Sequence, residues 1–254
     1  MQKIWIIAKM SLLENSRKQV FHVLCLLMIM VIAGSTLLSI FTEGVKLKIL
    51  KDLCTTCILF GGAVLAIALG ATGIPNDVES RTIFPIIARP VTRMQYIIGK
   101  FLGTILTVAM GVAAMSVVFG ALIYTYQRSF DTFLPIVTLF TMLEVAVIAA
   151  VATAISTLAT PAMSAILTFI IYVCGTIKIG YFGGMINQSG GVAKAVSCLI
   201  YHFLPNLECF NLKTALVHSD TIPTAYLVQV AVYGLCYVAF MLALASIRFA
   251  KREV

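Results

Sequence analysis

Six apolar runs, most of them about twenty residues or longer, divide this chain, and runs of that length cross the hydrocarbon core of a membrane. They must form helices, because lipid offers no hydrogen-bond partner to an exposed backbone. Hydrophobic residues make up 61% of the 254 residues and charged residues only 11%, so a soluble domain is excluded. The sequence predicts an all-α integral membrane protein with one transmembrane domain, 1–254, and spans at 20–41, 53–74, 96–124, 133–158, 163–179 and 226–250.

Two further segments have a mixed character. Residues 1–19 are expected to form an amphipathic helix on the membrane surface, because the membrane–water interface is the favoured position of a tryptophan ring such as that of Trp5. Residues 180–222 are expected to form an external, re-entrant hairpin, because 192–203 is apolar but too short to cross. Cys198 and Cys209 both fall in this segment, so a disulfide between them is an open alternative if that side is oxidising.

A polar, arginine-rich stretch, 75–100, separates the second predicted span from the third. Asn76 is expected to cap a short amphipathic helix, with Glu79 placed to reach back to the free N–H groups. Arg89 precedes a proline and should end that helix, and Thr92 begins a second capping box that starts the third span. The physics leaves two interpretations open: an interfacial helix that merely re-enters the bilayer, or a docking element for a soluble partner.

The distribution of lysine and arginine predicts the orientation of the chain. Six spans place both termini on one side, together with the stretch at 75–100, and that side holds eleven basic residues against seven on the other. Basic residues are enriched in cytoplasmic segments. We therefore expect both termini and residues 75–93 to lie in the cytoplasm, with the protein in a cell (inner) membrane.

No catalytic group of residues is visible in the sequence. The three histidines are scattered, and the CxxC formed by Cys54 and Cys57 lacks the second pair that a zinc site needs. The phosphate-binding pattern G-x-x-x-x-G-K-[ST] does not occur. We expect a non-catalytic subunit that binds no cofactor, metal or nucleic acid. If ATP drives the protein, another chain must bind it.

Glu144 lies near the middle of the fourth predicted span, where a lone carboxylate costs about 2.5–3.5 kcal/mol on insertion scales. It should therefore face the protein interior. Two roles stay open for it: a lining group of a translocation path or proton relay, or a polar contact between packed helices.

The stretch at 75–100 resembles the cytoplasmic loop of type-2, exporter-like ABC transporter permeases. That family shows an acidic residue, a threonine followed by a hydrophobic residue, a Pro-(Val/Ile)-(Ser/Thr)-Arg motif and a Gly-Lys pair. The matching residues here are Glu79, Thr82-Ile83, Pro90-Val91-Thr92-Arg93 and Gly99-Lys100. Arg81 replaces the glycine of many members. The resemblance extends over the chain, with a connecting helix, six spans and an external re-entrant region.

The resemblance implies a permease subunit that pairs with a second copy or a homologous permease, amid membrane lipids. Separate ABC ATPase subunits, which would bind ATP and Mg, would dock on a coupling helix within 75–93. By position, the residues implied in coupling to the ATPase are Asp77, Glu79, Arg81, Phe84, Arg89 and Arg93. The substrate of such a transporter would be hydrophobic or amphipathic.

Three other classes of protein remain alternatives on the sequence alone. A secondary transporter or channel usually offers an inverted repeat or several intramembrane charges, whereas Glu144 is essentially the only such charge here. A membrane-embedded enzyme would need a set of catalytic groups that this chain does not offer. A scaffold subunit of a larger assembly is harder to separate, because no substrate path can be read from the sequence.

Overall fold

The computed structural model describes residues 2–38, 46–80, 92–128, 133–177, 204–213, 216 and 223–250. These residues are almost entirely helical and include no β-strand. The helices are α1 (Gln2–Arg17), α2 (Gln19–Leu38), α3 (Lys46–Glu79), α5 (Arg93–Gln127), α6 (Leu134–Ser156), α7 (Pro161–Ile177), η3 (Glu208–Phe210) and α11 (Thr224–Ala250).

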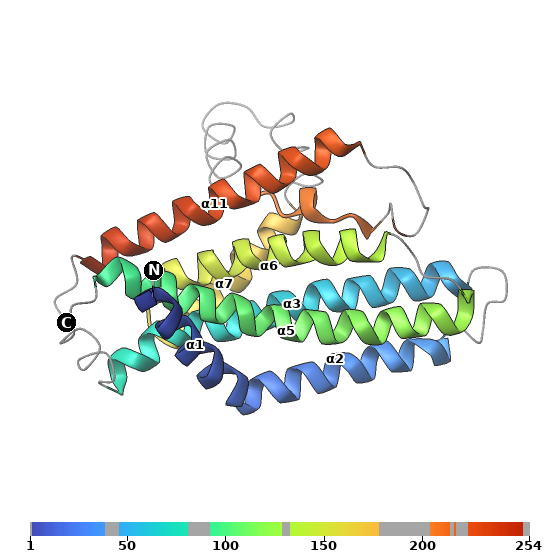
Figure 1. Ribbon diagram of the computed structural model, residues 1–254, viewed down its shortest axis with the longest axis horizontal. Coiled ribbons are helices and arrows are strands. Elements are labelled where there is room, and N and C mark those ends of the chain that lie inside the picture. Colours follow the sequence, from blue (N-terminus) through green and yellow to red (C-terminus); the bar gives the residue numbers. More distant parts are fainter. Residues whose placement is uncertain are drawn as a thin grey trace, which may run out of the picture.

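Helix α3 lies at the centre of the bundle and contacts α2, α5, α6 and α7 (Figure 1). Helix α6 packs against α3 and also contacts α5, α7 and α11. Small residues allow α3 and α6 to approach closely, since a Cβ atom added to Gly70 would lie 2.8 Å from the Cβ of Ala152. Membrane helices associate through such close packing, because lipid is as apolar as their side chains.

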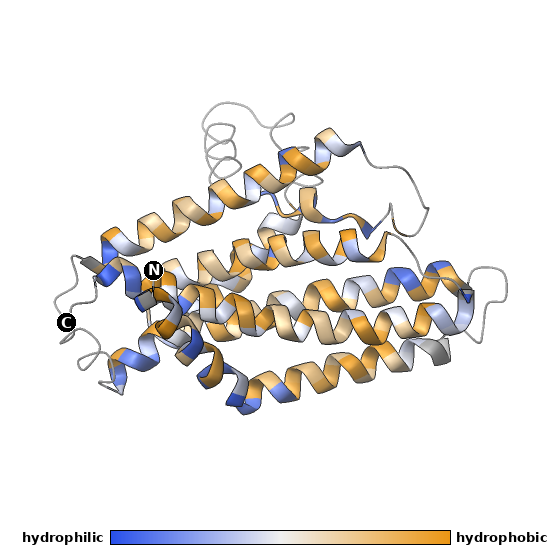
Figure 2. Ribbon diagram, viewed as in Figure 1, coloured by the Kyte–Doolittle hydropathy of each residue, from blue (hydrophilic) through white to orange (hydrophobic). Residues whose placement is uncertain are grey.

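The two ends of the bundle differ from its middle. Figure 2 shows apolar residues along most of each long helix, with hydrophilic residues gathered near the helix ends. At one end lie α1, the last turn of α3, the first turn of α5 and the last turn of α11 (Figure 1). At the other end Lys213 pairs with Asp52 near the start of α3, with 3.0 Å between Nζ and Oδ1. The bundle therefore has an apolar belt between two polar ends.

The structure supports four to five membrane spans among the described residues. Helices α3, α5, α6 and α11 are long and apolar enough to cross a bilayer, and α1 with α2 passes as a fifth, broken span bent by 63°. Helix α7 is apolar but has only 17 residues. The described residues thus confirm the predicted helical class and are consistent with an integral membrane protein, whereas the count of six spans stays a prediction.

The predicted helix start at Asn76 is wrong. Helix α3 continues through Pro75 and ends at Glu79, so Asp77 and Glu79 lie in a last turn rather than a first turn. Proline removes one helical hydrogen bond, but the turn continues because the Asn76 carbonyl accepts from the Ser80 N–H at 2.9 Å. The two carboxylates therefore sit at the end of a helix dipole that disfavours negative charge.

The start of α5 agrees with the sequence pattern. Thr92 is its N-cap, and the reciprocal hydrogen bonds between Thr92 and Gln95 form the predicted capping box. The separation between the predicted spans 133–158 and 163–179 is also confirmed, since α6 ends at Ser156 and α7 begins at Pro161. Residues 81–91, the rest of the predicted coupling segment, lie outside the described residues.

The described part of the predicted external segment packs into the bundle. Leu207 and Phe210 are buried, and the Leu207 N–H donates to the carbonyl of Gly175 in α7. The N–H of Asn206 donates to the Tyr233 hydroxyl in α11 at 2.8 Å. Residues 204–212 thus fill the space between α6, α7 and α11. Cys198 lies outside the described residues, so a disulfide between it and Cys209 stays an open alternative.

Candidate functional site

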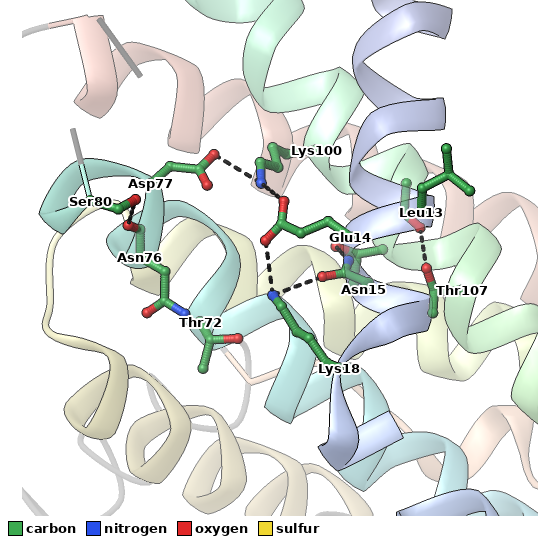
Figure 3. A network of polar contacts seen from close by, with 12 residues as sticks. Leu13, Glu14, Asn15, Lys18, Thr72, Asn76, Asp77, Ser80, Lys100 and Thr107 are labelled. Carbon is green, nitrogen blue, oxygen red and sulfur yellow. Dashed lines mark hydrogen bonds and ion pairs between the residues drawn. The ribbon is translucent and has the colours of Figure 1, made fainter. Parts of the chain in front are cut away.

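A cluster of charged side chains joins α1, α3 and α5 at one end of the bundle (Figure 3). Lys100 of α5 lies at its centre, with Nζ 2.8 Å from Asp77 Oδ2 and 3.0 Å from Glu14 Oε2. The Tyr96 hydroxyl donates a second hydrogen bond to Asp77. We call Glu14, Asp77, Tyr96 and Lys100 the Lys100 cluster. It connects the end of α3 and the start of α5 to the N-terminal helix.

The Lys100 cluster is largely shielded from solvent. The side chains of Lys100 and Asp77 are 8% and 10% exposed, whereas that of Glu14 is 44% exposed. Desolvated charges are costly unless they are paired and hydrogen-bonded. Lys100 provides the positive partner for Asp77 and also offsets the unfavourable position of Asp77 in the last turn of α3. The pairing therefore stabilises the last turn of α3.

Lys18 extends the cluster along α1. Its Nζ lies 3.2 Å from Glu14 Oε1 and 2.9 Å from Asn15 Oδ1. Burial raises the pKa of Glu14, but Lys100 and Lys18 outweigh that effect, so the net pKa is lowered. A lowered pKa means that the Glu14 ion pairs stabilise the fold at neutral pH and lose that effect as the pH falls through the lowered pKa.

Two glycines of α5 let α1 lie directly against it. A Cβ atom on Gly99 would be 2.7 Å from Ile7 Cβ, and one on Gly103 would be 2.5 Å from Ser11 Cβ. Real side chains do not approach so closely, so only glycine fits at either position. Two glycines at this Gly-x-x-x-Gly spacing lie on one face of a helix and let a neighbouring membrane helix approach closely. The structure identifies α1 as the helix that occupies this face.

The first turn of α5 also holds the last turn of α11. Arg93 Nη1 donates to the Phe249 carbonyl at 3.0 Å, which is favourable because the carbonyls at a helix C-terminus are partly negative. The rings of Tyr96 and Phe249 stack with their centroids 5.9 Å apart. The start of α5 thus contacts three other helices, α1, α3 and α11.

The six predicted coupling residues do not share one environment. Asp77 points into the bundle, and Arg93 contacts α11. Glu79 is exposed at the end of α3. The remaining three, Arg81, Phe84 and Arg89, lie outside the described residues. Their roles stay predictions.

Sequence reasoning missed Lys100 and Glu14 as a pair. Lys100 entered only as part of a Gly-Lys motif, although a lysine at the start of an apolar run needs a nearby carboxylate or the membrane interface. That requirement was the available signal. It could not select Glu14 and Asp77 among the acidic residues of the chain.

Glu144 is 2% exposed, which agrees with the predicted interior position. Its Oε2 has no hydrogen-bond partner among the described residues. Glu208 and Tyr172 lie close enough to interact with it electrostatically. Its role in a path or in helix packing stays a prediction.

The chain matches a family model described as ABC-2 family transporter protein. The match covers residues 5–254, which is nearly the whole chain. No curated protein matches the chain.

Proposed function

Because the chain belongs to the ABC-2 family of transporter proteins and is therefore an ABC transporter permease, we propose that it moves a hydrophobic or amphipathic substrate across the membrane. Energy would come from ATP hydrolysis on separate ATPase subunits, which would carry the ATP and Mg. A second permease, identical or homologous, would complete the pathway. The surrounding partner is membrane lipid, and the proposed location is a cell (inner) membrane with both termini in the cytoplasm.

The observation that carries the coupling proposal is the position of the Lys100 cluster. Asp77 precedes residues 81–91 in the chain, and Tyr96 and Lys100 follow them. The two ends of that segment are therefore tied to each other and, through Glu14, to α1. A force applied to the segment would reach α1, α3, α5 and α11 together.

A mechanism follows from this connection. Closure of the ATPase pair on ATP would move the two coupling segments of the permease dimer, and each rigid junction would move its attached helices. The pathway between the permeases would then change from inward to outward access. Glu79, Arg81, Phe84 and Arg89 are proposed to contact the ATPase. Asp77 and Arg93 are proposed to act through their contacts inside the helix bundle, which hold the two ends of residues 81–91 in place.

Glu79→Ala tests the coupling proposal. Because Glu79 is exposed at the unfavourable end of the α3 dipole, its removal should leave folding and membrane insertion intact. At an interface, loss of a charged hydrogen-bonding group costs about 2–5 kcal/mol. We expect weaker co-purification with the ATPase and slower transport-coupled ATP hydrolysis, measured in the reconstituted complex, and the same for Arg81→Ala.

Lys48→Ala provides the matched control, because Lys48 is exposed near the start of α3 at the opposite end of the bundle. It should affect neither measurement. Wild-type assembly and turnover in both Glu79→Ala and Arg81→Ala would show that residues 75–93 do not couple to the ATPase.

Cysteine labelling tests the proposed orientation. In a cysteine-free background, Ser80→Cys should react with a membrane-impermeant maleimide only after permeabilisation, because Ser80 is exposed at the end proposed to be cytoplasmic. Lys48→Cys, at the other end, should react in intact cells. The reverse pattern would reject the orientation that the basic residues predict.

A further inference from the structure

We propose that the outward face of α1 is a binding surface for anionic phospholipid headgroups. This face consists of exposed cations interleaved with exposed apolar side chains, all pointing away from α5: Trp5, Ile6, Lys9, Met10, Leu13 and Arg17. The proposal does not depend on the transport function. It concerns which lipids surround this helix.

The orientation of α1 is fixed by its inner face. Ile7 and Ser11 lie against the two glycines of α5, and Glu14 pairs with Lys100. The helix therefore cannot rotate to hide its other side. Trp5, 63% exposed, and Met10, 61% exposed, remain outside these contacts.

The composition of the outward face matches the interface of an anionic bilayer. Large apolar side chains can enter the boundary between headgroups and acyl chains, and Lys and Arg extend their charged ends to lipid phosphates. Lys9 and Arg17 are both exposed, and the described part of the chain offers neither of them an ion pair. A zwitterionic surface would accept the apolar side chains, but it has no net negative charge to balance the excess positive charge of this face.

The direction of α1 also favours lipid as the occupant. The chain bends by 63° between α1 and α2, so α1 leaves the direction of the spanning helix and crosses the end of the bundle. That end carries the polar ends of α3, α5 and α11 (Figure 2). A second copy seated symmetrically on this face would bring Lys9 and Arg17 toward their own counterparts, which like-charge repulsion opposes.

Trp5 provides a direct probe, because it is the only tryptophan in the chain. The purified full chain would be placed in nanodiscs of phosphatidylcholine with a fixed fraction of phosphatidylglycerol. Two samples would be compared at equal total bromine. One carries bromine on the acyl chains of phosphatidylcholine, and the other carries it on those of phosphatidylglycerol. We expect brominated phosphatidylglycerol to quench Trp5 several-fold more strongly, with the difference shrinking as NaCl screens the charges.

Charge variants then assign the preference to this face. A basic residue near the surface contributes about 1 kcal/mol, or roughly a fivefold preference for anionic lipid. Lys9→Gln with Arg17→Gln should abolish most of the difference in quenching, whereas Lys9→Arg with Arg17→Lys should retain it. Lys48→Gln, which removes one positive charge at the other end of the bundle, should leave it intact, whereas Lys9→Gln alone, which also removes one, should reduce it.

Several outcomes would overturn the proposal. Equal quenching by the two brominated lipids would show a surface without charge preference, and no quenching by either would show that protein covers Trp5. An equal loss of the quenching difference in Lys48→Gln would show that the lipid preference reflects the net charge of the protein and not this face. Potassium phosphate and NaCl at matched ionic strength should act alike, since stronger displacement by phosphate would indicate a site for free phosphate rather than for lipid.

Discussion

Replacing Lys100 with methionine is expected to destabilise the folded permease by about 3–5 kcal/mol, the cost of removing one partner from a buried ion pair. Asp77 would keep its hydrogen bond from Tyr96 but lose the positive charge 2.8 Å away. It would then be a buried carboxylate at the negative end of a helix dipole. The lost ion pair with Glu14 should cost less, because Glu14 is partly exposed and keeps its ion pair with Lys18. Thermal unfolding of the purified chain in mild detergent measures the loss.

A second substitution distinguishes lost pairing from general damage. Asp77→Asn in the Lys100→Met background removes the buried charge that Lys100 no longer balances and leaves an oxygen that accepts from Tyr96, so much of the lost stability should return. Lys48→Met, at an exposed position, should change little. If Lys100→Met unfolds at the wild-type temperature, or if the double variant is less stable than the single one, the cluster does not join these helices as proposed.

The sequence predicted the helices well where the controlling physics is local. The predicted span at 133–158 corresponds to α6, Leu134–Ser156, and that at 226–250 to α11, Thr224–Ala250. The length of an apolar run and the capping box at Thr92 are properties of neighbouring residues, and each is sufficient to place a helix. The number of spans is different, because a 17-residue helix such as α7 lies at the lower limit of what crosses a membrane.

The candidate site could not be predicted in the same way, because its contacts are long-range. Glu14 and Lys100 are 86 residues apart in the chain, so no local pattern selects one for the other. The extension of α3 through Pro75 was missed for a related reason. Proline normally disfavours a helix interior, but here the final turn is held from outside by Lys100 and Tyr96, which bind Asp77.

Gly103→Ala is expected to destabilise the protein although alanine is the better helix former. The new Cβ would lie 2.5 Å from Ser11 Cβ and 2.7 Å from the Ala8 carbonyl oxygen, so α1 must shift away from α5. Overpacking of this kind costs about 1–3 kcal/mol, and a shifted α1 would also lengthen the Glu14–Lys100 pair. Thermal unfolding should show a lower midpoint, and Trp5 emission should report the displaced helix.

The matched control is the same substitution where space is open. A Cβ atom on Gly34 of α2 would meet nothing within 4 Å, so Gly34→Ala should be neutral or stabilising by up to about 1 kcal/mol through helix propensity. If Gly103→Ala lowers the stability and Gly34→Ala does not, the loss comes from the contact between α1 and α5 and not from the helix backbone. If Gly103→Ala is as stable as Gly34→Ala, α1 does not lie against α5 at that glycine. The Lys100 cluster would then join α3 and α5 but not α1.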